Sequence, residues 1–592
     1  MDFEQNPLIV KYSSGSVKGS RATTNNGRAI LSFRGIPYAL PPVGDLRFKR
    51  SSPAGPQHNL INGTKESKKC LQLNALFQSH IDRNSNCPFS KGSEDCLYLN
   101  VYTIPYKENL PVVVFFHGGA FIIGSNEKML YGPEVLLDRD LVMVAVNYRL
   151  GPLGFLSLEN DSAPGNLGLH DQYLALLWIK ENIFSFGGDA DSVTLMGQSA
   201  GSMSAMLHMV SPFSKGLFHR VVALSGTPSN LLLHNDRKPA VYARTLASQF
   251  GCPEDASSEG VLLCLQSQDA ENIVKKTSLM LDWDVANPMP WVPVVDAGCC
   301  SQPFLPKTFS DTVKAGEAAK VPIIMGTCRD EGLIMSAPFH QDSCRWNLLK
   351  RQWNTWAPLL FLNRERDLVT EKDINCGKDI KDFYFGEDTQ ISELKYSQEN
   401  LTKLQQIYTS SWFHEPWDQD GSLLVSQGYT VYSFVLTHPP EFSLMDIFRM
   451  KLPSLVLMFM VRKLVPNSRN PYGKFGVCHG DDLCYLLPLS APGFPTRVVN
   501  TSQKDTQDRL LDLVESMAKN GEPKIKDQPN WESLDNGQYL IIEEGGTKMG
   551  RDLEMDKQIK FWKKVKEKQG LVEHSDQAIT VVFDKIAVNR ST

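Results

Sequence analysis

A serine between two glycines is the first feature of the sequence that could do chemistry. Ser199 lies in the stretch "GQSAG" at 197–201, which has the form G-x-S-x-G. An apolar run at 193–196 precedes it and predicts a strand, and a helix-forming stretch at 202–209 follows it. A strand, a glycine turn and a helix are typical of a nucleophile elbow, which places a serine at a helix N-terminus. The alternative is a serine in an ordinary glycine turn, because so short a pattern also arises by chance.

A serine hydroxyl is a weak nucleophile unless an imidazole accepts its proton and a carboxylate orients that imidazole. Candidates for both roles follow along the chain: Asp330 and Glu331 in "GTCRDEG", then His479 in "GVCHGDDL". Alone, a histidine is usually a hydrogen-bonded polar residue, and an acid before glycine usually belongs to a loop. Together they give the chain order serine, acid, histidine, which is the order of α/β-hydrolases. The joint occurrence favours a catalytic triad.

Acyl transfer also needs N–H donors for the oxyanion of its tetrahedral intermediate. A glycine-rich stretch, "HGGA" at 117–120, directly follows the apolar run 112–116. We expect the backbone N–H groups of Gly119, Ala120 and Ala200 to form the oxyanion hole, since one donor usually comes from the residue after the nucleophile.

These residues need a scaffold, and the chain alternates between apolar strands and helices. Helical periodicity marks 171–186, and apolar runs predict strands at 112–116, 141–146, 193–196, 221–224, 321–325 and 430–436. Buried strands separated by helices indicate an α/β fold with a mostly parallel central sheet and helices on both faces. In such sheets functional groups lie at the carboxyl ends of the strands, where the serine, the acids and the glycine-rich stretch all fall.

Composition and charge narrow the class further. The chain has 592 residues, 42% of them hydrophobic, and a formal net charge of -5 without basic blocks, which argues against nucleic-acid binding. The apolar run 452–461 is far shorter than the roughly 20 residues that span a bilayer. With its basic flanks, this run predicts either a core-facing helix or an interfacial lid within the segment 441–475. No transmembrane segment is expected.

Cysteines and sequons leave the compartment open. Among twelve cysteines, Cys70 with Cys96 and Cys252 with Cys264 are closely spaced, and neither pair belongs to a metal-ligand cluster. Such pairs suit disulfides in an oxidising compartment. An extracellular glycoprotein is favoured by them and by five N-x-S/T sequons, at Asn62, Asn160, Asn400, Asn500 and Asn589. A cytoplasmic location is the alternative, since the N-terminal residues show no secretory signal.

Longer motifs resemble the type-B carboxylesterases of the cholinesterase and carboxylesterase family. They include "FRGIPYALPPVGDLRF" at 33–48, "EDCLYLNVY" at 94–102, "FFHGGAF" at 115–121, "NYRLGPLGFLS" at 147–157, "GNLGLHDQYLALLWIKENIFSFGGDADSVTLMGQSAG" at 165–201 and "HGDDL" at 479–483. The resemblance implies one α/β-hydrolase domain over 1–568, followed by a C-terminal tail at 569–592. It implies a serine esterase that needs no metal or cofactor.

The resemblance also assigns roles to particular residues. It implies that Ser199, Glu331 and His479 form the triad, with Glu331 rather than Asp330 as the acid because Glu331 directly precedes the glycine. Four further pairs fall on structural positions of the family: the disulfides Cys70–Cys96 and Cys252–Cys264, and the buried ion pairs Arg47–Glu94 and Arg149–Asp171. These pairs are expected to be scaffold rather than chemistry.

Departures from the family narrow the substrate. Cholinesterases carry a tryptophan in the first cysteine loop and an acid before the nucleophile, whereas this loop has no Trp and the acid is replaced by Gln198. Both departures argue against choline esters. The "GQSAG" motif resembles many insect esterases, including juvenile hormone esterases, but so short a motif does not establish a hormone substrate.

The residues of the expected pocket come from several stretches. Met289 and Trp291 match the acyl-pocket side of the family, and 353–361 is a further candidate wall, with ordinary core as the alternative for each. Asp482 matches a second acid near the site, where it either tunes His479 or binds a buried water.

The sequence therefore predicts a serine carboxylesterase that hydrolyses hydrophobic esters, whether xenobiotic, lipid-like or hormonal, through an acyl-serine. The alternative is a binding member of the same fold. It would be either an adhesion protein similar to neuroligins and glutactin, or a scavenger that turns over slowly.

Overall fold

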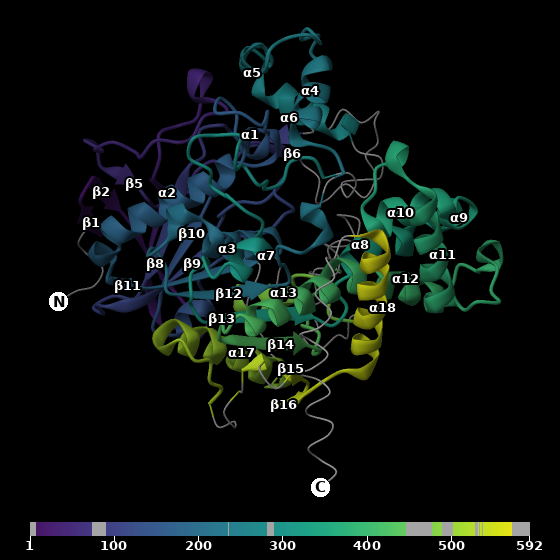
Figure 1. The fold of residues 1–592 in the computed structure, drawn as a ribbon. Helices are drawn as coiled ribbons and strands as arrows, with labels where there is room; N and C mark the ends of the chain where they lie inside the picture. Colours follow the sequence, from purple (N-terminus) through teal and green to yellow (C-terminus); the bar gives the residue numbers. More distant parts are fainter. Residues whose placement is uncertain are drawn as a thin grey trace.

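In the computed structural model, the described part of the chain is built around a mixed sheet of eleven strands (Figure 1). The described residues are 8–73, 90–234, 236–280, 289–443, 445, 476–487, 501–526, 531, 533–534 and 537–570. The apolar run 452–461 and the lid proposed around it lie outside the described residues, as does the tail beyond residue 570.

Strands from the amino-terminal part of the chain lie towards one edge of the sheet, and strands from the carboxyl-terminal part lie towards the other. In that order the strands are β16 (Gly546–Gly550), β15 (Tyr539–Glu543), β14 (Val431–Leu436), β13 (Ile323–Cys328), β12 (Arg220–Leu224), β11 (Gly188–Gln198), β9 (Leu110–Phe116), β10 (Val142–Val146), β8 (Tyr98–Thr103), β4 (Ala29–Pro37) and β3 (Ser20–Thr23). The seven strands from β15 to β10 pair in parallel, and the outer pairs are antiparallel. The sheet is therefore mostly parallel, as the apolar runs predict.

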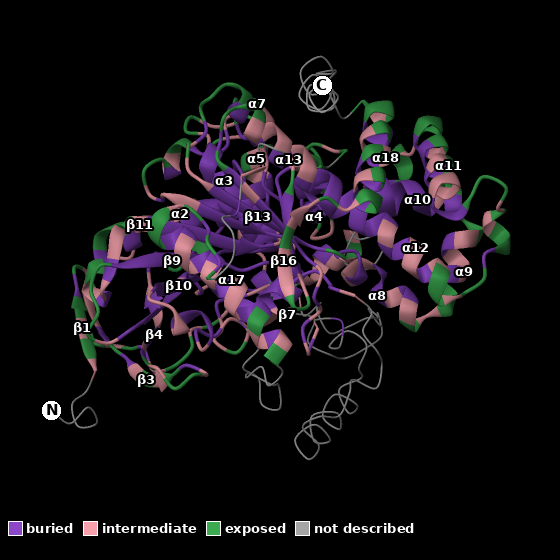
Figure 2. Ribbon diagram, turned by 90° about the horizontal axis from the view of Figure 1, so that it is seen from below, coloured by how far each residue is buried: buried purple, intermediate pink, exposed green. Residues whose placement is uncertain are grey.

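Alternating side chains divide the sheet between two hydrophobic layers. Along β9, Val112 and Val114 belong to one layer, whereas Val113 and Phe115 belong to the other. All are buried because helices cover both faces, which is why each strand reads as a continuous apolar run (Figure 2).

Helices pack on each face. Those described are α1 (Gly151–Phe155), α2 (Leu167–Asn182), α3 (Ala200–Val210), α4 (Pro239–Ser248), α5 (Ser258–Gln266), α6 (Ala270–Lys276), α7 (Phe309–Lys314), α8 (Leu333–Gln341), α9 (Ser343–Arg351), α10 (Trp353–Leu362), α11 (Glu371–Phe385), α12 (Gln398–Thr409), α13 (Glu415–Ser426), α16 (Asp481–Leu486), α17 (Thr501–Asn520) and α18 (Leu553–Gln569). Side chains of α2 and α3 lie in one hydrophobic layer, and those of α17 lie in the other. None of these described helices is long and apolar enough to cross a bilayer.

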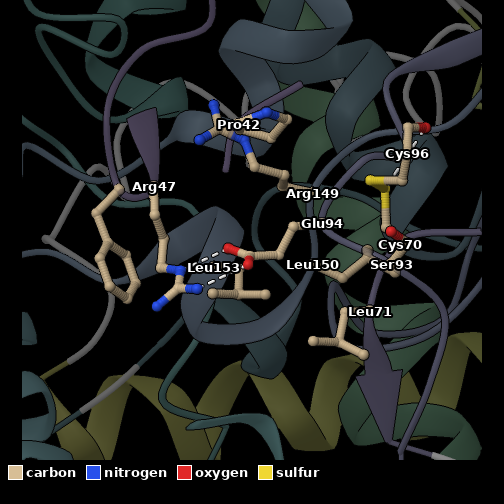
Figure 3. A pocket seen from close by; sticks show the side chains of 11 residues that line it. Pro42, Arg47, Cys70, Leu71, Ser93, Glu94, Cys96, Arg149, Leu150 and Leu153 are labelled. Carbon is tan, nitrogen blue, oxygen red and sulfur yellow. Dashed lines mark hydrogen bonds and ion pairs between the residues drawn. A yellow bond between two sulfur atoms is a disulfide. The ribbon is translucent and has the colours of Figure 1, made fainter. Parts of the chain in front are cut away.

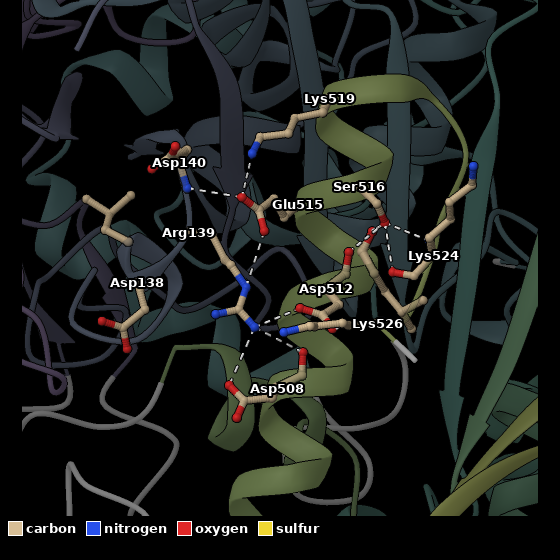
Figure 4. Close-up of polar contacts among 12 residues, drawn as sticks. Asp138, Arg139, Asp140, Asp508, Asp512, Glu515, Ser516, Lys519, Lys524 and Lys526 are labelled. Carbon is tan, nitrogen blue, oxygen red and sulfur yellow. Dashed lines mark hydrogen bonds and ion pairs between the residues drawn. The ribbon is translucent and has the colours of Figure 1, made fainter. Parts of the chain in front are cut away.

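Polar contacts fix α17 beneath the sheet. Arg139, just before β10, bonds Asp512 at 2.7 Å and Glu515 at 3.3 Å, and it lies 3.5 Å from Asp508 (Figure 4). The three carboxylates share one face of the helix because they are spaced three and four residues apart. This half-buried cation therefore joins α17 to the loop that leads into β10.

Two small sheets and two disulfides complete the scaffold. The strands β1 (Ile9–Tyr12), β2 (Gly15–Lys18) and β5 (Ile61–Asn62) form one sheet, and β6 (Gln72–Leu73) pairs with β7 (Ser90–Lys91). The disulfides are Cys70–Cys96 and Cys252–Cys264, the pairs that the family resemblance implies.

Candidate active site

Ser199 occupies a strained turn between β11 and α3. Its backbone has φ 56° and ψ -125°, a conformation that an L-residue rarely adopts, and its side chain is only partly buried. The flanking glycines allow the chain to turn: a Cβ on Gly197 would lie 2.1 Å from the Gly201 carbonyl oxygen, and one on Gly201 would lie 2.0 Å from that of Phe116. The G-x-S-x-G spacing is therefore a steric requirement, and the turn has the form of a nucleophile elbow.

Glu331 and His479 meet in the interior at the carboxyl end of the sheet. Glu331 follows β13, is fully buried, and accepts a hydrogen bond of 2.6 Å from Nδ1 of His479 at its Oε2. Its other oxygen, Oε1, accepts from the Thr327 hydroxyl at 2.9 Å and the Cys328 N–H at 2.7 Å. The carboxylate is thus oriented by fixed donors on one side and holds the imidazole with the other.

The charge of Glu331 is stabilised despite its burial. Burial alone opposes ionisation, but the nearby His479, the hydrogen bonds it donates and those from Ser225 and the Cys328 N–H outweigh that effect, so the pKa of Glu331 lies below its usual value. A carboxylate in this state can keep the Nδ1 proton of the imidazole in place.

Asp330, the neighbouring acid, has different contacts. Its Oδ1 accepts from Gln405 at 3.0 Å, and its Oδ2 accepts from the Val477 N–H at 2.8 Å. Val477 lies two residues before His479, so Asp330 braces the loop that carries the histidine. The geometry thus favours Glu331 over Asp330 as the partner of the imidazole.

The other edge of the His479 ring faces Gln198. The amide nitrogen of Gln198 lies 3.0 Å from Nε2 of His479, and the ring of Phe413 lies over the imidazole with 4.7 Å between centroids. Across the described chain, no hydrogen bond joins Ser199 to His479. The sequence predicts that Ser199 and His479 act as a pair. In this structure, the polar partner of Nε2 is Gln198, the residue before the serine.

The glycine-rich loop, which contains two of the predicted oxyanion donors, lies against the elbow. A Cβ on Gly118 would lie 3.0 Å from Cβ of Ser199. Gly119 and Ala120 both have positive φ, at 117° and 54°. Within the described residues, the N–H groups of Gly119 and Ala120 donate to no protein acceptor, and the N–H of Ala200 lies in the first turn of α3, where helical amides have no intrahelical partner. These three N–H groups remain available for an oxyanion.

His117 supports this loop from below. Its ring stacks on Tyr148 with 4.4 Å between centroids, and the Tyr148 hydroxyl donates to the His117 carbonyl at 2.6 Å. Burial lowers the pKa of His117 to about 4, so this imidazole is neutral at physiological pH. Its role is structural: it packs against Tyr148 and supports the glycine-rich loop.

Asp482 is buried behind the acid–histidine pair. The hydroxyl of Ser225 lies 3.5 Å from its Oδ2, and the Leu483 N–H donates to its Oδ1 at 2.8 Å. Burial, followed by the charge of Glu331, raises the pKa of Asp482 to about 7. Two adjacent buried carboxyl groups therefore divide their roles: Glu331 ionises readily and Asp482 tends to keep its proton.

The expected pocket residues are buried, but the described contacts do not connect them to Ser199. Met289 and Trp291 are 5% and 2% exposed. The stretch 353–361 forms most of α10, and Trp353 donates to the Gly377 carbonyl at 2.8 Å, so this stretch packs into a helical layer. For 353–361 the structure therefore supports the alternative of ordinary core.

Phe413 is the neighbour of the site that sequence reasoning missed. It belongs to η9 (Ser410–His414), a turn of π-helix between α12 and α13. The indole Nε1–H of Trp412 donates to the Leu360 carbonyl at 3.0 Å, and Nε2 of His414 lies 3.0 Å from the Cys328 carbonyl oxygen, so the turn is held on both sides of Phe413. No short sequence pattern marks a π-helical turn, although such turns are frequent at functional sites.

A small cavity elsewhere is structural in character (Figure 3). It lies beside the Cys70–Cys96 disulfide and is lined by Arg47, Glu94 and Arg149, but by none of Ser199, Glu331 and His479. Arg47 bonds both oxygens of Glu94, at 2.5 and 2.7 Å. The cations that line the cavity are thus already neutralised by the expected ion pairs.

Arg149 forms the second of these pairs, with Asp171 on α2. Its Nε and one terminal nitrogen each donate to an oxygen of Asp171 at 2.8 Å, and both side chains are buried.

The described residues contain no group of three His, Cys, Asp or Glu side chains that could hold a metal ion.

Comparisons with known proteins show the family of this chain. The model of the carboxylesterase family matches residues 6–562. The juvenile hormone esterase of Tribolium castaneum is 33% identical over 89% of this chain and 86% of its own length, and a carboxylic ester hydrolase of Bombus ignitus is 32% identical over 91% and 90%. The crystal structure of juvenile hormone esterase from Manduca sexta, with OTFP covalently attached, superposes with a TM-score of 0.77 at 25% identity, covering 95% of this chain and all of that one.

Proposed function

The chain belongs to the carboxylesterase family, as its sequence motifs indicate, and we propose that this carboxylic ester hydrolase uses Ser199 to cleave hydrophobic esters through an acyl-serine intermediate. One observation carries the proposal. A fully buried Glu331 bonds Nδ1 of His479 at 2.6 Å, beside a serine held in a strained elbow. This arrangement can generate a nucleophile at neutral pH.

The first half of the proposed reaction gives each of these groups a role. His479 accepts the Ser199 proton at Nε2 as the Ser199 oxygen attacks the ester carbonyl, and Glu331 stabilises the resulting imidazolium. The oxyanion accepts hydrogen bonds from the N–H groups of Gly119, Ala120 and Ala200. The imidazolium then gives its proton to the leaving alkoxide, so the alcohol departs and the acyl-serine remains.

Water completes the cycle by the same groups in the same roles. His479 takes a proton from the water, and the water oxygen attacks the acyl-serine carbonyl, so that the oxyanion forms again. His479 then gives this proton to the Ser199 oxygen as it leaves. The products are a carboxylic acid and free enzyme. The Ser199 proton leaves with the alcohol and a proton from water replaces it, so the cycle balances and no group is oxidised or reduced.

The nature of the substrate is proposed from what surrounds the imidazole. Phe413 covers the His479 ring, Gln198 beside it carries no charge, and relatives of this chain are named juvenile hormone esterase and carboxylic ester hydrolase. An aromatic ring over the imidazole and an uncharged side chain at Nε2 favour a neutral, lipophilic ester over a cationic one. The resemblance to juvenile hormone esterases extends this proposal to small lipid-like or hormone esters.

One observation favours a second candidate function. Nε2 of His479 faces Gln198 in this structure, and a Ser199 that never gains the imidazole would react slowly or not at all. A member of this fold in that state would act as a binding protein or a slow scavenger.

Labelling Ser199 tests both candidates. Wild type and Ser199→Ala are exposed to a small organophosphate and weighed intact, and ester turnover is measured in parallel. One adduct on wild type alone, with turnover lost in Ser199→Ala, is the expected result, because a partly exposed hydroxyl contributes little to stability. Failure to label wild type would favour the binding protein, and labelling with only one turnover would favour the scavenger.

A further inference from the structure

Gln198 contacts the candidate general base on the edge that catalysis uses. It is the last residue of β11 and is 6% exposed, and its amide nitrogen lies 3.0 Å from Nε2 of His479. The opposite ring nitrogen, Nδ1, lies 2.6 Å from Glu331. Both nitrogens of the imidazole are therefore engaged, and neither is engaged by Ser199.

The chemistry of the two partners fixes the tautomer of the ring. An amide NH₂ group can only donate, so Nε2 must present its lone pair to Gln198. A carboxylate can only accept, so Nδ1 must carry the proton that faces Glu331. This is the tautomer in which the imidazole can take a proton from a serine. Gln198 and Glu331 together select the form of His479 that is competent as a base.

The other end of the Gln198 amide is fitted against the glycine-rich loop. A Cβ on Gly118 would lie 2.7 Å from Oε1 of Gln198, so the absent side chain leaves the space that the amide oxygen occupies. Phe413 packs over the imidazole at 4.7 Å. The amide is thus confined between the histidine and the loop that precedes the oxyanion donors.

From this geometry we propose that Gln198 is a positioning residue for His479: its amide holds Nε2 as a hydrogen-bond acceptor until the Ser199 hydroxyl takes that place. The inference rests on the proposed function. No covalent bond changes in this step; one donor to Nε2 replaces another, and the Nδ1 proton stays on the ring facing Glu331.

Several titratable groups surround the ring, and Gln198 is the neutral one at Nε2. Glu331 faces Nδ1, and the remaining groups lie on the elements packed around the pair: Asp330 beside Glu331, Cys328 on β13, His414 on η9, Cys478 before the histidine, and Asp481 and Asp482 on α16. Glu331, the acid that bonds the ring, lies at Nδ1, so a carboxylate introduced at position 198 would place a negative charge at the opposite nitrogen, Nε2.

The test compares two substitutions of Gln198 with a matched buried glutamine. Gln198→Glu keeps the shape and adds a negative charge, and Gln198→Met keeps the length without a donor. Gln172 provides the control, because its Oε1 lies 3.0 Å from Nε2 of the buried His208, outside the site. Turnover of a p-nitrophenyl ester is measured from pH 5 to 9 for each variant, with melting temperature as the check on folding.

We expect Gln198→Glu to move the acid limb of kcat/KM to higher pH by about one unit or more, because a carboxylate at Nε2 stabilises the protonated ring. Gln198→Met should lower kcat by about 5–10-fold with KM nearly unchanged, as for one lost hydrogen bond. Gln172→Met should lower the melting temperature and leave the acid limb in place. If Gln198→Met folds poorly, the isosteric Gln198→Glu still decides.

An acid limb in Gln198→Glu within about 0.3 units of wild type, or an equal shift in Gln172→Met, would overturn the inference while leaving the proposed function intact. Turnover retained in Ser199→Ala would instead overturn the proposed function, and this inference with it.

Discussion

Replacing Glu331 by glutamine should disable the enzyme by reversing the tautomer of His479. The Thr327 hydroxyl and the Cys328 N–H both donate to Oε1 of Glu331, at 2.9 and 2.7 Å. In Glu331→Gln these donors keep the amide oxygen on their side, so the amide NH₂ faces Nδ1 of His479. A donor there forces the imidazole to carry its proton on Nε2, where the proton from Ser199 should go.

The size of the effect follows from the loss of the general base. An equivalent carboxylate-to-amide change in a serine triad lowers kcat by about 10⁴, and we expect about 10³–10⁴ here. This corresponds to about 4–5.5 kcal/mol of activation free energy. The side chain keeps its shape and its two donors on Oε1, so the melting temperature should change little.

Asp330→Asn is the matched control, one residue away. Its carboxylate accepts from Gln405 and Val477 on separate oxygens, and an amide can satisfy only one of these donors. The expected loss is about 1–2 kcal/mol of unfolding free energy, with kcat/KM reduced less than about tenfold. The assay is hydrolysis of a p-nitrophenyl ester, with circular dichroism to follow folding. Similar loss of activity in both variants would refute the assignment of Glu331.

Two further predictions concern stability. Folded Asp482 keeps its proton up to about pH 7, whereas the unfolded chain ionises near 3.8, so the folded state binds more protons between these values and loses stability as pH rises through them. Asp482→Asn should therefore gain about 2–4 kcal/mol relative to wild type between pH 4 and 8, and a gain independent of pH in urea unfolding would contradict this. Arg149→Met should cost about 3–5 kcal/mol by leaving Asp171 buried and unpaired. Arg139→Met, on the half-buried α17 network, should cost about 1 kcal/mol and less at high salt, and equal losses in the two arginine variants would rule out the distinction.

The fold could be predicted largely from the sequence because strands that are buried on both faces are apolar along their length. Each predicted apolar run overlaps an observed strand, from β9 to β14, and the ends agree within three residues except at the start of β11; the predicted helix at 202–209 lies within α3. Strand boundaries moved where polar residues extend the pairing: β11 runs from Gly188, although its apolar part begins at Val193. Hydrophobic periodicity reports burial and not hydrogen bonding, so it misses such ends.

The elbow could also be recognised from its motif, because part of its steric requirement, the contact of Gly197 with Gly201, lies within five residues. Only glycine fits at 197 and 201, where a Cβ would come within 2.1 and 2.0 Å of backbone oxygen. The same holds for the glycine-rich loop at 118–119, which must approach Ser199 closely. Gly197 is constrained within the motif, by Gly201, whereas Gly201 is constrained by Phe116 and Gly118 by Gln198 and Ser199, which only folding brings together. The sequence by itself therefore determined the form of the turn that carries Ser199, and folding placed the glycine-rich loop against it.

Tertiary structure alone decided what surrounds the imidazole. Phe413, from a π-helical turn 66 residues before His479, covers its ring, and Gln198, 281 residues before it, meets its Nε2. The choice between Asp330 and Glu331, which the family resemblance implied, acquired a physical reason from their different hydrogen-bond partners. Such contacts depend on how separate elements pack. Neither periodicity nor spacing along the chain predicts the distance between two side chains that come together only on folding.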